Sequence, residues 1–81
     1  MPSFSELPGE IKRPKFLKAL GRLGFIINEV GGVGSHAKAL WPKTQKCIIV
    51  QSELRKDVLY YLLKEIKEYT GVTWEEIKRE L

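Results

Sequence analysis

The chain has 81 residues, of which 43% are hydrophobic and 30% charged, and a formal net charge of +4. This length supports one small core, and the composition is typical of a folded domain and far from the low-apolar composition of disordered chains. Residues 1–50 hold eight lysines and arginines against three glutamates, whereas residues 51–81 hold six against seven acidic residues. An N-terminal basic excess is compatible with a polyanionic partner, although many small soluble domains are mildly basic.

A single cysteine and the absence of long apolar runs indicate the compartment. Cys47 has no second thiol for a disulfide or a metal pair, which fits a reducing environment. No stretch approaches the roughly 20 apolar residues of a membrane helix, and the first residues lack a basic-then-apolar signal pattern. We therefore expect a cytoplasmic protein without a membrane partner, with Cys47 as a small core residue of a strand.

The first part of the chain predicts an irregular lead-in followed by a short helix. Residues 1–11 contain two prolines, a glycine and two serines, which are typical of irregular structure. From about Pro14, the apolar residues Phe16, Leu20 and Leu23 recur at helical spacing, and Gly24 follows as a stop. This helix is amphipathic.

A basic stripe follows one side of that helix. Lys15, Lys18 and Arg22 recur at positions i, i+3 and i+7, with no acidic residue in the segment to neutralise them. Such a stripe is either a solvated face or a surface for phosphates.

Three strands are predicted next. Residues 25–30 and 46–51 are rich in β-branched side chains, and residues 35–41 alternate with a period of two up to Pro42. Glycines 31, 32 and 34 separate the first two strands as turn formers, and "PKTQ" separates the last two. Short turns between consecutive strands predict an antiparallel meander.

Two helices are predicted to close the chain. Residues 52–70 place apolar side chains from Leu54 to Ile66 on one helical arc, with Ser52 as N-cap and Gly71 as the stop. Residues 73–81 begin with Thr73 and Glu76 in capping-box spacing and predict a short C-terminal helix.

The element order α-β-β-β-α-α predicts one α+β domain over residues 1–81. Helices before and after an antiparallel sheet pack together on one face of it and leave the other face open. We therefore expect a three-stranded antiparallel sheet with the helices on one face.

Two short motifs accompany this element order: "LGF" at residues 23–25, and "GSH" at residues 34–36 where the second strand begins. In these features, from about Gly9 to Leu81, the chain resembles the HicA (YcfA-like) family of mRNA interferase toxins. The resemblance implies a fold like the double-stranded-RNA-binding domain, cleavage of mRNA, and a HicB-like antitoxin protein as partner. The matching catalytic position is His36, with Gly34 and Ser35 as its setting.

The chemistry of RNA cleavage is compatible with this residue. Attack by the RNA's own 2′-OH needs a group to take its proton, a group to protonate the leaving 5′-oxygen, and positive charge near the phosphorane, but no metal or other cofactor. Histidine suits the first task because its ordinary pKa lies near neutrality. Lys38, two residues along, shares the strand face of His36 and would supply charge. Since the chain has no second histidine, the acid is a lysine, a tyrosine, a water or a group from another chain.

Two other classes remain open. A non-catalytic RNA-binding module would use the same fold, with RNA contacts from Lys15, Lys18 and Arg22, from Ser35, or from the open sheet around Lys38 and Lys46. A protein-interaction domain would instead dock a partner on the open sheet or on the helix of Trp74. Aromatic residues such as Trp41, Tyr60 and Tyr61 are expected in the core or at a partner surface rather than as platforms for bases. Acidic clusters for a metal are lacking.

Overall fold

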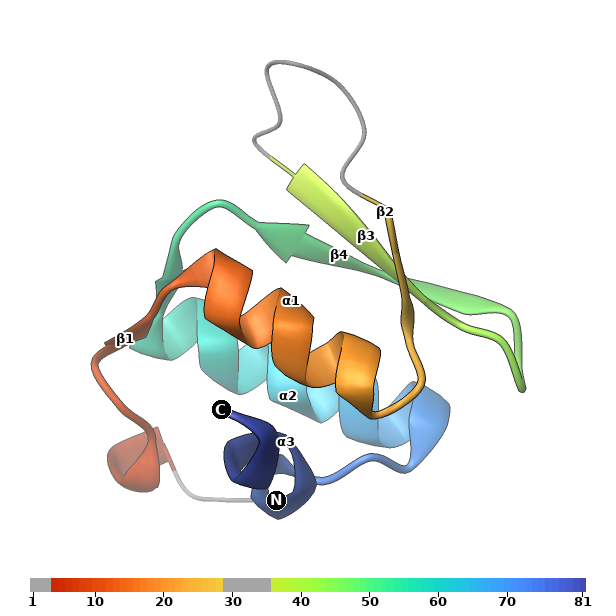
Figure 1. Cartoon of the computed structure of the whole chain (residues 1–81). Helices are drawn as coiled ribbons and strands as arrows, with labels where there is room; N and C mark the ends of the chain where they lie inside the picture. The colour runs from red at the N-terminus through yellow and green to blue at the C-terminus, as the bar shows by residue number, and fades with distance from the viewer. Residues whose placement is uncertain (1–3, 29–35) are drawn as a thin grey trace.

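Three antiparallel strands with helices on one of their faces form the frame of the molecule (Figure 1). The computed structural model describes residues 4–28 and 36–81, with Phe4 and His36 described by their backbone only. The described elements, in chain order, are the 3₁₀ helix η1 (Phe4–Glu6), β1 (Glu10–Ile11), α1 (Arg13–Arg22), β2 (Ile26–Asn28), β3 (His36–Trp41), β4 (Lys46–Gln51), β5 (Leu54–Arg55), α2 (Lys56–Thr70) and α3 (Trp74–Glu80). The mixed α+β class predicted from the sequence is confirmed.

The three-stranded sheet has the order β2-β3-β4, and both pairings are antiparallel. The register of β3 against β4 runs from His36 opposite Gln51 to Trp41 opposite Lys46, and β2 pairs Asn28 with Lys38. The predicted meander is therefore correct, and β4 covers the residues expected for it.

Side chains alternate between the two faces of the β3–β4 hairpin. The buried set consists of Ala37, Ala39 and Trp41 on β3 and Ile48 and Val50 on β4. The set between them is exposed or half-buried and consists of Lys38, Leu40, Cys47, Ile49 and Gln51. One sheet face is thus covered, and the other, called the open face below, is accessible.

The helices supply the other half of the core. The buried helical residues are Phe16, Leu17, Ala19 and Leu20 of α1, Leu59, Leu62, Leu63 and Ile66 of α2, and Trp74 and Ile77 of α3. Figure 1 shows the helices gathered on one side of the three strands, which is the arrangement that the sequence predicts. No helix in the described ranges combines the length and apolarity needed to cross a membrane.

The beginning of α2 differs from the prediction. Ser52 is not its N-cap, because the helix starts at Lys56 and Arg55 occupies the cap position without a side-chain cap bond. Leu54 instead lies in β5, where it pairs with Ile11 of β1 and is buried. The lead-in is correspondingly more ordered than expected, since β1 is held in a second, two-stranded sheet.

The end of α2 and the start of α3 have the capping residues predicted from the sequence. Gly71 ends α2 in a left-handed conformation with φ of 80°. The backbone N–H of Glu76 donates to Thr73 Oγ1 at 3.3 Å, and the N–H of Thr73 donates to Glu76 Oε1 at 3.1 Å. This capping box fixes the start of α3, whose Trp74 and Ile77 close the core.

Gly24 turns the chain from α1 into the sheet. Its φ is +113°, a backbone conformation that residues with a Cβ rarely adopt. The neighbouring Phe25 donates its N–H to the carbonyl of Leu20 at 3.0 Å, so β2 starts directly beside the end of α1. The backbone conformation at this position therefore explains why the "LGF" segment has a glycine there.

We predict that Gly24→Ala lowers the free energy of unfolding by about 1–3 kcal/mol, because alanine is strained at this φ. Gly21→Ala is the matched control: Gly21 lies inside α1 without a positive φ, and an added methyl would be 3.8 Å from the side chain of Ile27. That change is expected to stabilise by up to about 1 kcal/mol. Urea unfolding measures both, and equal effects of the two variants would contradict the role of the φ angle.

Candidate nucleic-acid interface

His36 is the first residue of β3 and pairs with Gln51 of β4. Along β3 the residues of the other parity, from Ala37 to Trp41, are buried under the helices. The register position of His36 therefore belongs to the open face, as does that of Lys38, whose side chain is exposed. The predicted sharing of one face by His36 and Lys38 agrees with the register.

The open face has a polar and an apolar end. His36 stands opposite Gln51, and Lys38 stands between Asn28 of β2 and Ile49 of β4. The next row consists of Ile26, Leu40 and Cys47. Adjacent strands are about 4.8 Å apart and alternate residues about 6–7 Å apart, so the polar positions lie within the span of one or two nucleotides.

Asn28 and Gln51 were not predicted as site residues. Their amides each supply two N–H donors next to the positions of His36 and Lys38. No sequence pattern points to them, because their place on the open face follows only from the register of β2 and β4 against β3. The arrangement can accept a phosphodiester with one ammonium group and two amides around it, which is the kind of set that stabilises a developing anion.

Ser35 and Gly34, predicted as the setting of His36, lie outside the described residues, as do Gly31 and Gly32. The prediction that Cys47 is a core residue is wrong. It is exposed on the open face rather than buried in the core, because Ile48 and Val50 of the same strand occupy the covered face.

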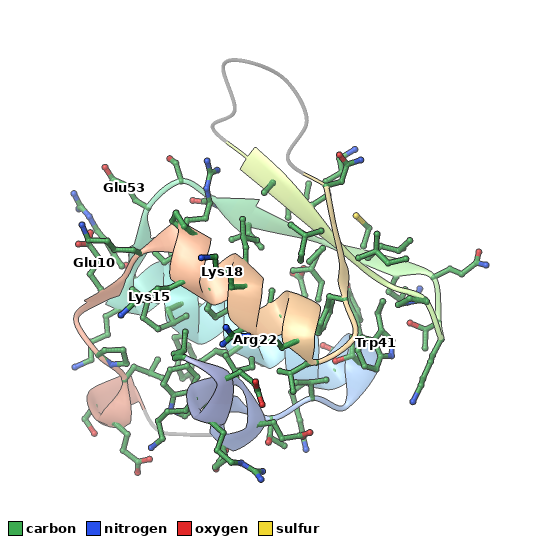
Figure 2. The ribbon with its side chains drawn as sticks, in the orientation of Figure 1. Glu10, Lys15, Lys18, Arg22, Trp41 and Glu53 are labelled. Carbon is green, nitrogen blue, oxygen red and sulfur yellow. The ribbon has the colours of Figure 1, made fainter. Side chains whose placement is uncertain are left out.

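The basic stripe on α1 has the geometry predicted for it. Lys15, Lys18 and Arg22 are exposed, and Figure 2 shows them along one side of α1. Arg22 Nη1 donates to the carbonyl of Glu80 at 3.0 Å, which ties the end of α1 to α3 and leaves further guanidinium donors for a ligand. Among the described residues, no carboxylate forms an ion pair with Lys15 or Lys18.

The structure does not bring all predicted cations together. The stripe lies on the helix layer, whereas Lys38 lies on the open face of the sheet, and the shortest extent of the molecule is 19 Å. Lys46 is at the opposite end of β4 from Gln51, about 17 Å away along the strand, with Nζ 5.7 Å from the ring centre of Tyr69. Lys46 pairs with Trp41, a residue of the covered face, so the prediction that it lies on the open face with Lys38 is wrong. The stripe and Lys38 are therefore separate, and Lys46 belongs to neither.

Of the three aromatic residues considered above, the structure places Trp41 in the core and leaves Tyr61 exposed. Trp41 is 9% exposed and packs against Phe25 with ring centres 4.7 Å apart, so it belongs to the core. Tyr60 is half-buried, and its ring meets that of Tyr61 edge to face at 5.5 Å. Tyr61 is 68% exposed and lies on α2.

Neither a metal site among the described residues nor a similar known protein indicates the function. Within residues 4–28 and 36–81 no three histidine, cysteine or acidic side chains are grouped so that they could hold a metal ion. No protein-family model, curated protein or solved structure matches the chain. Its function has to be argued from its own residues.

We predict that replacing Lys15, Lys18 and Arg22 together by glutamine weakens RNA binding about tenfold or more at low salt. The slope of log affinity against log salt should flatten by about 0.7–0.9 for each lost phosphate contact. Fluorescence anisotropy with a labelled RNA over a salt series measures both.

The matched control replaces Lys64, Lys67 and Arg79, which are exposed on α2 and α3, and removes the same charge. Its affinity should fall much less. Equal losses in the two triple variants would show that net charge, and not the stripe, governs binding.

Proposed function

We propose that the chain is a HicA-like toxin of a type II toxin–antitoxin system, an endoribonuclease that cleaves mRNA in the cytoplasm. His36 is its general acid or base, and a HicB-like antitoxin is the protein that neutralises it. The observation that carries the proposal is the position of His36: it begins the second strand of the meander, on the open face, with Lys38 next along that face. The order α1-β2-β3-β4-α2-α3, to which β1 and β5 are added, supports it as well.

The chemistry assigned to this end of the open face is transesterification within RNA. His36 takes the proton of a 2′-OH, whose oxygen attacks the adjacent phosphorus, and the P–O5′ bond breaks. Lys38 stabilises the extra negative charge of the phosphorane, and the amides of Asn28 and Gln51 orient the phosphate. The leaving 5′-oxygen receives its proton from a lysine, a tyrosine, a water or a group of another chain.

A second candidate is a non-catalytic RNA-binding module. The separation of the α1 stripe from the open face favours it, because RNA held on the helix layer would not need His36. The two functions differ in one simple assay: the module retards RNA on a gel and leaves it intact, whereas the nuclease shortens it.

We predict that His36→Ala reduces RNA cleavage by about 10²–10⁴-fold, the usual contribution of general acid–base catalysis, and abolishes growth inhibition. RNA affinity should stay within about threefold, because the stripe and its phosphate contacts are unchanged. Single-turnover cleavage in buffer with a chelator measures the first effect, and anisotropy measures the second.

Ile26→Ala, on the apolar end of the same open face, is the control for altering the sheet surface and should cleave at nearly the original rate. Both variants are expected to lose less than about 1 kcal/mol in the free energy of unfolding. A folded His36→Ala protein that cuts RNA as fast as the original would disprove the catalytic assignment.

A further inference from the structure

β4 is an edge strand with little of the usual protection. Among the described residues it pairs only with β3, so its other edge has no strand beside it. Its sequence, Lys-Cys-Ile-Ile-Val-Gln, carries a charge only at its first residue and has neither proline nor glycine. Soluble proteins normally guard such edges with charges, prolines, bulges or a short length, because a long uncharged edge pairs with other chains. The described part of β2, at the opposite edge, is only three residues long.

A groove runs along this edge between β4 and α2. It consists of two neighbouring cavities of about 220 and 670 Å³, which share Ile49, Gln51 and Glu65 in their walls. Val58, Tyr61 and Leu62 complete the first cavity, and Cys47 and Tyr69 complete the second. We call this feature the β4–α2 groove.

The walls of the β4–α2 groove expose large apolar and aromatic side chains. Ile49 is 53% exposed, Tyr61 68% and Tyr69 38%. Exposed aromatic side chains beside an apolar one are the usual anchors of a protein–protein contact. A free strand edge with a helix as its second wall is the setting in which an extended peptide adds a strand to a sheet.

The charges of the groove select the chemistry of its occupant. Glu65 is the charged residue among its described lining residues, which include no lysine or arginine. A nucleic acid, whose phosphates need cations, is therefore a poor occupant, whereas a peptide with a lysine or arginine facing Glu65 is complementary.

A second copy of the chain fits less well than a peptide. Pairing two β4 edges about a twofold axis would place both copies of α2 on the same face of the joined sheet, next to the newly paired strands. Since α2 already forms one wall of the groove, the space between the strand and the helix suits one extended segment.

We propose that the β4–α2 groove binds an extended segment of a partner protein by strand addition to β4. Apolar side chains at alternate positions of that segment contact Ile49 and Tyr61, and a lysine or arginine faces Glu65. The groove is distinct from the α1 stripe, and binding there requires neither RNA nor His36.

The probe is a phage-displayed library of random peptides of about twelve residues, long enough to span a strand of ordinary length. The library is selected on the full chain, and the enriched peptides are synthesised. Titration calorimetry measures their affinity, and amide hydrogen exchange by NMR reports whether backbone amides of β4 become protected. Sedimentation of the free protein reports its oligomeric state.

Two pairs of substitutions locate the binding. Ile49→Lys places a charge on the edge, and Ile26→Lys does the same to the equally exposed isoleucine of β2, at 55%. Glu65→Lys reverses the charge of the groove, and Glu68→Lys does so at an exposed position of α2 that does not line it. Circular dichroism serves as the control that all four variants are folded.

The expected result is binding that Ile49→Lys and Glu65→Lys each weaken about tenfold or more, with both controls close to the original protein and with new protection in β4. Several outcomes would overturn the proposal. These are the absence of enriched peptides, peptides insensitive to both groove variants, binding without protection in β4, and a dimer of the free protein that Ile49→Lys dissociates.

Discussion

The alternation of side chains along β3 is the constraint on which the rest of the structure depends. Ala37 and Ala39 are small and fully buried, so the helices pack closely over the centre of the sheet. The period of two then assigns the register positions of His36 and Lys38 to the open face. A slip of one residue would exchange the two faces and bury a lysine, which is why the register is strongly specified.

The sequence predicts the elements in this molecule better than the pairing between them. Leu54 fits the apolar arc of a helix, but its position is decided by pairing with Ile11, more than forty residues earlier in the chain, which no local pattern records. In β4 both alternate sets are largely apolar, so periodicity alone could not choose between Cys47 with Ile49 and Ile48 with Val50. The hairpin register with β3 makes that choice and leaves Cys47 exposed.

The candidate site was predictable to the extent that it lies on one element. Lys38 follows from His36 by strand period, and the α1 stripe follows from helical spacing. Asn28 and Gln51 come from neighbouring strands and require the register, while the separation of the stripe from the open face requires the layers. A sequence pattern carries neither kind of information, because both depend on contacts between distant residues.

The three surfaces of this small domain differ in the residues that they present. The α1 stripe is cationic, the β4–α2 groove carries Glu65, and Gln51 belongs both to that groove and to the row of His36. A strand added to β4 would stand about 10 Å from β3, so its side chains on the open-face side would lie beside a phosphodiester held over His36. The stripe on the helix layer would remain uncovered. Under the proposed function, retention of RNA by the stripe and access to His36 are therefore separable, and a protein segment bound in the groove would block the second without displacing the first.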